Sequence, residues 1–134
     1  MTMRYLLDTN IVSDLIRNPH GRAASRAIAT GDEALCTSIV VAAELRFGAL
    51  KRGAKALSAR VAAVLSTLQV EPFEPPADAH YAHIRMVLEA SGQQIGANDM
   101  LIAAHAIALD CTLVTDNERE FVRVPGLRVA NWLR

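Results

Sequence analysis

Short apolar runs alternate with longer segments of helical spacing along the chain, and this alternation restricts the fold more than any other feature. The short runs predict strands at residues 4–7, 34–37, 70–73, 112–115 and 127–130. The longer segments predict helices at residues 9–17, 22–30, 39–52, 55–68, 78–90 and 98–109. Ser38 is the expected cap of the third helix, and Gly53 is expected to end it. Strands that alternate with helices predict an α/β fold with a short, mainly parallel sheet flanked by helices on both faces.

The size and composition of the chain suit a single domain. Its 134 residues are enough for one core, so we expect one domain over residues 1–134. The longest uncharged runs are far shorter than a membrane span, and the N-terminus lacks the apolar segment of a secretory signal. We therefore expect a cytoplasmic protein. In that compartment Cys36 and Cys111, which lack metal-type spacing, are expected to be buried thiols rather than a disulfide.

Charge is balanced overall but not locally. A formal net charge of zero argues against a nucleic-acid binder that works through its overall charge. Between Glu44 and Glu71, however, every charged residue is basic, namely Arg46, Lys51, Arg52, Lys55 and Arg60. This basic run is either a solvated face of two helices or a surface that contacts nucleic-acid phosphates.

Four acidic residues occupy positions where a charge is costly. Asp8 and Asp116 each follow a short apolar strand, at the sheet edge where ligands bind in open α/β folds. Glu44 and Asp99 lie in apolar helices and have no cationic side chain three or four residues away. If the four carboxylates converge, they repel one another unless a divalent cation joins them. Oxygen ligands without His or Cys favour Mg²⁺ or Mn²⁺ over zinc.

Other acids have simpler interpretations, and Asp99 itself has two. Asp14 is followed three residues later by Arg17, which predicts a surface ion pair, and Glu118 and Glu120 alternate with Arg119. Asn98 or Asp99 could cap the helix 98–109 by accepting a hydrogen bond from its first turn. The alternative is that Asp99 points into a site shared with the other three acids.

Four sequence motifs together resemble a known family. The segments LLDTNIVSDL, ELRFGA, IGANDMLIAAHA and LVTDN are similar to the PIN-domain family, and most closely to the VapC-type toxins of bacterial type II toxin–antitoxin systems. The resemblance spans nearly the whole chain and implies a PIN-like fold and an endoribonuclease that depends on Mg²⁺, with Mn²⁺ as a substitute. It places the catalytic and metal-binding acids at Asp8, Glu44, Asp99 and Asp116, accompanied by Thr9, Asn10, Thr115 and Asn117. An acid sometimes stands in this toxin group where this chain has Asn117, and the resemblance is compatible with one bound ion or with two.

The resemblance also implies partners. They are an RNA substrate, for which the basic run would bind phosphates, and a cognate VapB-type antitoxin. The toxin is expected to form a homodimer and a larger assembly with the antitoxin, which alone contacts promoter DNA. Residues 39–50 and 98–109 are candidate contact surfaces between copies, although the same apolar residues would equally serve as ordinary core.

Two other functions fit part of this pattern. A phosphohydrolase with Asp8 as its nucleophile would normally carry a second acid two residues later, where this chain has Asn10. A binding module could instead use the four carboxylates to hold a basic peptide. The histidines make no better site, because His80 and His83 lack a convincing third ligand and His105 lies in an apolar helix, where we expect core.

Overall fold

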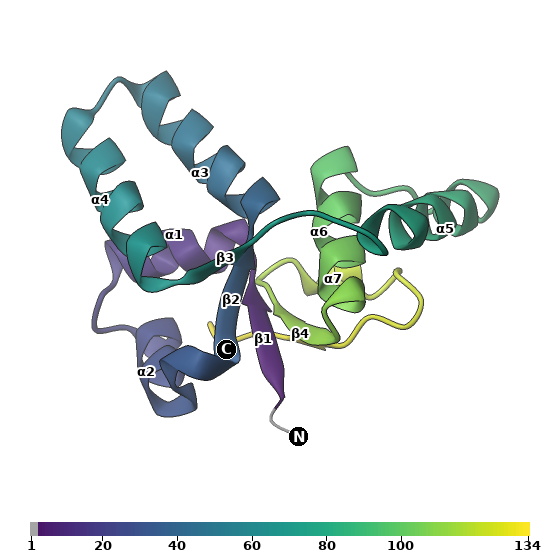
Figure 1. Ribbon diagram of the computed structural model, residues 1–134, viewed down its shortest axis with the longest axis horizontal. Helices are drawn as coiled ribbons and strands as arrows, with labels where there is room; N and C mark the ends of the chain where they lie inside the picture. Colours follow the sequence, from purple (N-terminus) through teal and green to yellow (C-terminus); the bar gives the residue numbers. More distant parts are fainter. Residues whose placement is uncertain (1–2) are drawn as a thin grey trace.

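A parallel sheet of five strands forms the centre of the structure, a computed structural model that describes residues 3–134 (Figure 1). The strands are β1 (Arg4–Leu7), β2 (Leu35–Ser38), β3 (Gln69–Glu71), β4 (Cys111–Val114) and β5 (Val129–Ala130). Their order in the sheet is β3-β2-β1-β4-β5. The chain builds outward from β1 in one direction and then returns to build outward in the other. The strand order therefore reverses between β1 and β4, the place where open α/β sheets leave a crevice at their carboxyl edge.

Both faces of the sheet are covered. In β1, Leu6 is paired with Cys36 of β2 and with Leu113 of β4, and neighbouring residues of a strand point to opposite faces. Leu6 and Leu7 are both completely buried, as are Leu113 and Val114. Because consecutive residues are buried, helices must cover the sheet on both sides, which confirms the predicted fold class.

Within residues 3–134, seven helices surround the strands. They are α1 (Thr9–Arg17), α2 (Arg22–Thr30), α3 (Ile39–Arg52), α4 (Lys55–Thr67), α5 (Ala77–Ala90), α6 (Ala97–Ala108) and α7 (Glu118–Phe121), with a short 3₁₀ turn, η1 (Asp32–Ala34), before β2. Figure 1 shows α1, α2 and α4 on one side of the strands and α5 and α6 on the other, while α3 and α4 form a hairpin that extends outward. The C-terminal end of β1 lies between α1, α3 and α6.

The ends of α3 follow the sequence prediction. The Ser38 hydroxyl accepts a hydrogen bond from the Val40 N–H at 3.0 Å, which satisfies one of the free donors of the first turn. Gly53 ends the helix with φ of 67°, a left-handed conformation that favours glycine. Both residues therefore have their predicted roles.

Most predicted elements are present, with shifted boundaries. The strand expected at 127–130 is reduced to Val129–Ala130, and the one expected at 70–73 lies at Gln69–Glu71. Other ends shift by one residue, as helix ends commonly do. The prediction missed η1 and α7, whose spans are too short to show helical periodicity.

The two cysteines are buried and free, as expected. Their sulfur atoms nevertheless lie 3.8 Å apart. Cys36 belongs to β2 and Cys111 to β4, which flank β1 on opposite sides. Strands separated by a third strand lie roughly 9–10 Å apart, more than the distance that a disulfide normally bridges. The pair therefore packs as two thiols.

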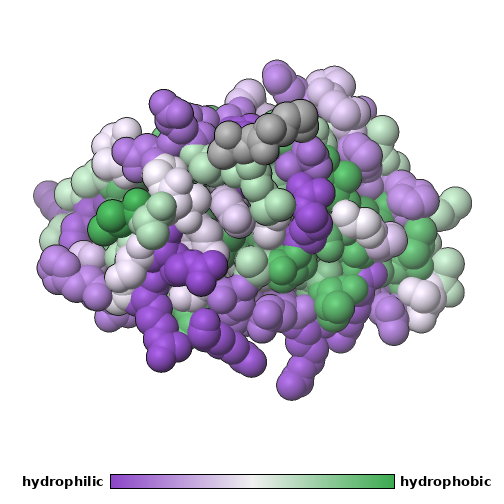
Figure 2. All heavy atoms as spheres, turned by 90° about the horizontal axis from the view of Figure 1, so that it is seen from below, coloured by the Kyte–Doolittle hydropathy of each residue, from purple (hydrophilic) through white to green (hydrophobic). Residues whose placement is uncertain are grey.

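The surface away from the carboxyl edge is mixed. Figure 2 views the molecule from the side on which β1 begins, and hydrophilic and hydrophobic side chains are interspersed there. In residues 3–134, no helix has both the length and the apolar character that crossing a bilayer requires.

Replacing Leu6 by Ala should lower the free energy of unfolding by about 2–5 kcal/mol, because Leu6 is completely buried at the centre of the sheet and its loss leaves a cavity. Urea unfolding measures the change. The control is Ile28→Ala on α2, where the side chain is 80% exposed and a change within about 0.5 kcal/mol is expected. Similar losses for the two variants would contradict the assigned core.

Candidate functional site

Asp8 lies at the point where the strand order reverses. It directly follows β1, and its backbone N–H donates to the Val114 carbonyl at the end of β4, at 2.9 Å. The side chain is only 4% exposed. One carboxylate oxygen, Oδ1, accepts from the Thr9 N–H at 2.8 Å, and the other, Oδ2, accepts from the Thr115 hydroxyl at 2.7 Å. Asp8 is thus a buried carboxylate held by donors from the ends of two neighbouring strands.

Asn10, in the first turn of α1, joins the segments that follow β1 and β4. Its side-chain N–H₂ donates to Asp8 Oδ2 and to Thr115 Oγ1, each at 3.4 Å, while its Oδ1 accepts from the Asp116 N–H at 3.0 Å. The Asn117 N–H donates to Thr115 Oγ1 at 3.0 Å. The position where an aspartyl phosphohydrolase would carry its second acid is therefore filled by an amide that holds the loops together.

Glu44 reaches the same place from α3. The Thr9 hydroxyl, in the first turn of α1, donates to Glu44 Oε1 at 2.8 Å. Glu44 is partly buried, and its charge contributes to raising the pKa of Asp8. Burial is the larger cause of that shift, and the hydrogen bonds from Thr115 and Thr9 oppose it. Thr9 therefore links the two acids, because its N–H donates to Asp8 and its hydroxyl donates to Glu44.

Asp99 approaches from α6 and does not cap that helix. Helix α6 begins at Ala97 after Gly96, and within residues 3–134 no side chain caps it. The interpretation of Asn98 or Asp99 as a cap is therefore wrong, because both residues already lie inside the first turn. The partly buried Asp99 carboxyl has its pKa raised to about 6, first by burial and then by the charges of Asp8, Glu120 and Glu44. Three of the four predicted acids thus lie close enough to repel one another.

Asp116 lies at the rim, and an unpredicted acid lies nearer. Asp116 is exposed, and its Oδ1 accepts from the Asn131 amide at 3.1 Å. Glu120, on α7, is one of the three acids whose charges raise the pKa of Asp99, after Asp8 and ahead of Glu44. The sequence gave no reason to choose Glu120, since its alternation with Arg119 is typical of a solvated surface. Asn131 was also missed, because a lone Asn after a short strand has no distinctive pattern.

The donor set suits a hard divalent cation in chemistry, though it is not gathered into a ready-made ligand group. Asp8, Glu44 and Asp99 supply carboxylate oxygens of the kind that Mg²⁺ and Mn²⁺ prefer, and burial together with mutual repulsion has raised the pKa of two of them. In the part of the chain that the structure describes, no three Asp, Glu, His or Cys side chains stand close enough to form a metal site as they are placed. A bound cation would have to draw the carboxylates inward.

A buried histidine ties α6 to α3, the two helices that carry Asp99 and Glu44. His105 is 1% exposed, as expected for a core residue, and its Nδ1 lies 2.8 Å from the Ser38 hydroxyl. Ser38 is also the cap of α3. The ring of Phe73 packs edge-on against the imidazole at 5.3 Å between centroids. Burial lowers the pKa of His105, which favours the neutral ring.

The basic run lies on the α3–α4 hairpin. All of its side chains, Arg46, Lys51, Arg52, Lys55 and Arg60, are exposed, and none forms an ion pair within residues 3–134. This placement is compatible with a solvated face and with a surface that binds phosphates.

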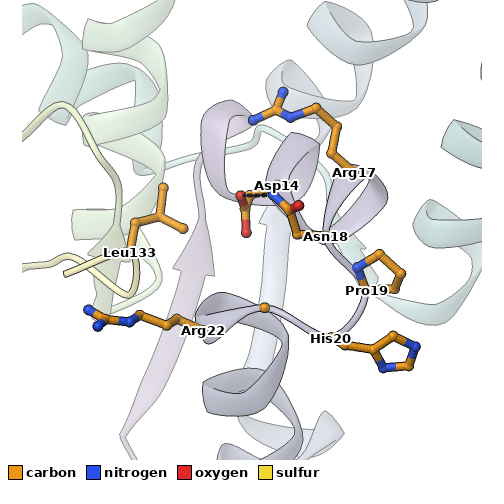
Figure 3. A pocket seen from close by; sticks show the side chains of 8 residues that line it. Asp14, Arg17, Asn18, Pro19, His20, Arg22 and Leu133 are labelled. Atoms are coloured by element: carbon orange, nitrogen blue, oxygen red, sulfur yellow. Dashed lines mark hydrogen bonds between the residues drawn. The ribbon is translucent and has the colours of Figure 1, made fainter.

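The expected ion pair between Asp14 and Arg17 does not form. Asp14 is buried and accepts from the Asn18 amide at 2.8 Å, and Figure 3 shows Arg17 lying apart from this pair. Spacing along a helix permits an ion pair, but here a nearer amide and the burial of Asp14 decide its partner.

Comparisons with known proteins agree over nearly the whole chain. Residues 5–127 match the family model described as PIN domain. The chain is 37% identical over 132 residues to ribonuclease VapC2 of Rickettsia felis, covering 97% of this chain and 98% of the relative. It is 33% identical over 131 residues to the tRNA(fMet)-specific endonuclease VapC of Salmonella typhimurium, with 97% and 98% covered. A solved structure of VapBC2 from Rickettsia felis, bound to a promoter DNA fragment, matches with a TM-score of 0.86 and 36% identity over 97% of this chain and 99% of that one.

Asp99→Asn should make the metal-free protein more stable at neutral pH and leave its stability unchanged in acid. Because the pKa rises from 3.8 in the unfolded chain to about 6 in the fold, ionisation of Asp99 destabilises the fold. That penalty is absent below about pH 4, grows as the pH rises and is complete above about pH 6. We expect a difference of up to about 3 kcal/mol at pH 7, measured by urea unfolding at several pH values. Asp78→Asn, an exposed acid in the first turn of α5, is the control, and a pH-independent difference for Asp99→Asn would contradict the assigned cluster.

Proposed function

Since this chain belongs to the PIN-domain family, among its VapC-type ribonuclease toxins, we propose that it is a Mg²⁺-dependent endoribonuclease of a toxin–antitoxin pair. Its catalytic and metal-binding acids would be Asp8, Glu44, Asp99 and Asp116. The observation that carries this proposal is the convergence of Asp8, Glu44 and Asp99, from a strand end and two helices, on one place at the carboxyl edge of the sheet. Such an arrangement destabilises the free protein and becomes favourable when a cation is held.

The chain's own residues prepare the site for hydrolysis of a phosphodiester. When bound, Mg²⁺ or Mn²⁺ would lower the pKa of a water and polarise a phosphoryl oxygen. The Thr9 N–H donates to one oxygen of Asp8 and the Thr115 hydroxyl donates to the other. These hydrogen bonds orient the carboxylate and favour its charged form. Thr9 also fixes Glu44. Asn10 and the Asn117 N–H hold Thr115 in turn, so the four polar residues would support the acids.

Asp116 and Glu120 would have unequal roles. Asp116 is exposed at the rim and is engaged by Asn131, so it would join the site through a change of side-chain conformation. Glu120 acts on Asp99 through its charge and is a candidate additional acid that the motif comparison does not suggest. The number of ions held depends on which of the two participates.

The proposed partners are a VapB-type antitoxin, an RNA substrate and a second copy of the chain. The solved structure of the Rickettsia felis VapBC2 pair on promoter DNA supports an antitoxin that brings the complex to DNA. For the homodimer, α3 offers Ile39, Phe47 and Leu50, which are 47%, 65% and 73% exposed. By contrast, residues 98–109 form mostly core, because Ile102, Ala103, Ala104 and Ala106 are completely buried.

The purified antitoxin-free chain should cleave structured RNA in Mg²⁺ or Mn²⁺, and chelation should stop the cleavage because the acids cannot activate water alone. Gel analysis of RNA fragments provides the measurement. Asp8→Asn, which keeps an oxygen acceptor but removes the charge, should lose most activity. Cleavage that persists after thorough chelation would exclude the metal mechanism, and a covalent aspartyl phosphate on Asp8 would support the phosphohydrolase instead.

Replacing Lys51, Arg52 and Lys55 together by Ala should weaken RNA binding and flatten its dependence on salt. The variant would neutralise fewer phosphates, so its binding would release fewer counterions. Binding of labelled RNA is measured over a series of salt concentrations in the presence of chelator. An unchanged slope of the logarithm of affinity against the logarithm of salt would mean that the three side chains merely face solvent.

A further inference from the structure

The strongest unassigned feature is a cationic depression of about 580 Å³, at the end of α1 that lies away from Asp8. It borders the first turn of α2 and the C-terminal residues of the chain. Three arginines and a histidine line it, and within residues 3–134 no acidic side chain does. They are His20, Arg22, Arg26 and Arg134. The depression therefore has the charge of an anion-binding site.

Helix α2 begins in this depression without the groups that usually stabilise a helix start. Gly21 precedes the helix and offers no capping side chain, and the first turn contains no acid. The free N–H groups of a helix start carry partial positive charge, for which acidic side chains or anions are the favourable neighbours. This helix has instead Arg22 at its first position and Arg26 one turn later, both of them exposed. A bound anion would offset this accumulation of positive charge.

A buried donor without an acceptor lies beside the same turn. Trp132 lines the depression and is only 2% exposed, and its Nε1 has no hydrogen-bond partner within residues 3–134. Tyr5 packs against the indole at 5.3 Å between ring centroids, and the guanidinium carbon of Arg26 lies 5.8 Å from the centre of the indole ring. Because Arg26 is long and exposed, rotation of its side chain would open the indole to a ligand. An unpaired buried N–H costs free energy, which a ligand oxygen would recover.

The neighbouring acids leave these cations available. Neither Arg22 nor Arg26 forms an ion pair within residues 3–134, and Arg134 approaches Glu118 only to 3.9 Å. Asp14 lines the adjacent depression but not this one, and its carboxylate accepts from the Asn18 amide at 2.8 Å (Figure 3). The positive charge of the depression is therefore not neutralised by the chain itself.

We propose that the N-terminus of α2, Arg22, Arg26 and the indole N–H of Trp132 form a binding site for a phosphate group. Helix starts and guanidinium groups both bind phosphate through N–H donors. Trp132 is too deeply buried to stack on a base, so the site would recognise the phosphate alone.

The phosphate source that fits the charge and position of the site is an RNA strand, and this choice of source rests on the proposed nuclease function. Helix α1 spans nine residues, or roughly 13 Å, between Asp8 and the depression. That length corresponds to about four nucleotides of a stacked strand. The site would hold the strand away from the cleaved bond without reading its sequence. A small phosphorylated molecule offers the same group, so the test compares the two sources.

Trp132 is the only tryptophan of the chain, so its indole N–H gives a single side-chain signal in a ¹H–¹⁵N correlation spectrum. The full-length chain is titrated in chelator, so that RNA binds without being cleaved. Oligouridine should move this signal downfield at micromolar concentration, because the N–H then donates to a phosphate oxygen. Inorganic phosphate should cause the same shift only at millimolar concentration, because it contacts this one site.

Arg22→Ala and Arg26→Ala should each weaken both interactions several-fold. For oligouridine, each should also lower the slope of the logarithm of affinity against the logarithm of salt by about 0.7, the value for one phosphate contact on a single strand. Arg85→Ala on α5 removes the same charge from an exposed position outside the depression and should change neither the indole shift nor the slope.

A second variant adds a negative charge and keeps the arginines. Ser25 is the exposed fourth residue of α2 and lines the depression. Ser25→Asp places an acid near the positive end of the helix, so its melting temperature should be equal or higher, while phosphate binding should weaken several-fold. Ala79→Asp, an exposed position in the first turn of α5, is the matched control for the added charge.

The outcomes separate this inference from the proposed nuclease. An indole signal that neither probe shifts, or equal shifts in the Arg22, Arg26 and Ser25 variants, would overturn the site even if RNA is cleaved in Mg²⁺. Inorganic phosphate that binds as tightly as oligouridine would sustain the site and assign it to a small phosphorylated molecule. A phosphate-dependent indole shift without RNA cleavage in Mg²⁺ would sustain the site and refute only the nuclease.

Discussion

The Asp8 carboxylate and the hydrogen bonds that it accepts hold the architecture of the site together. A carboxylate that is 4% exposed is costly unless its oxygens are satisfied, and here the Thr9 N–H and the Thr115 hydroxyl satisfy one oxygen each. These donors come from the first turn of α1, which follows β1, and from the loop after β4, so the hydrogen bonds to one buried carboxylate fix the relative position of two strand ends. Thr9 then extends the network to Glu44 on α3. A change at Asp8 would therefore disturb the geometry of the loops as well as the charge.

Sheet topology explains why the acids meet at this edge. All strand pairs are parallel, and the order reverses between β1 and β4, so the loops after these strands diverge and leave space for side chains. Helices α3 and α6 approach the same space, and the contact between His105 and Ser38 holds these helices together within the core. The fold thus provides rigid supports for carboxylates whose mutual repulsion opposes folding. The surrounding apolar core compensates for this loss of stability.

The sequence predicted the parts of this protein that depend on local patterns. Apolar runs identified β1 and β4, Ser38 and Gly53 identified the ends of α3, and the absence of nearby cations singled out Glu44 and Asp99. It could not predict contacts that tertiary packing decides. The place of Glu120 depends on α7, whose four residues are too few to show helical periodicity. Asp14 accepts from Asn18 and does not pair with Arg17, because Asp14 is buried. Burial depends on how the whole molecule packs.

The paired thiols inside the sheet have a practical consequence for experiments. Cys36 and Cys111 are 0% and 2% exposed, so a maleimide reagent cannot reach either sulfur in the folded protein. A single cysteine introduced at an exposed position would consequently react alone, without prior removal of the native thiols from the core. Spin labels or fluorophores attached to the α3–α4 hairpin could then report its motion in an otherwise unaltered chain. The same burial makes reactivity of the native sulfurs a direct measure of how often the central sheet opens.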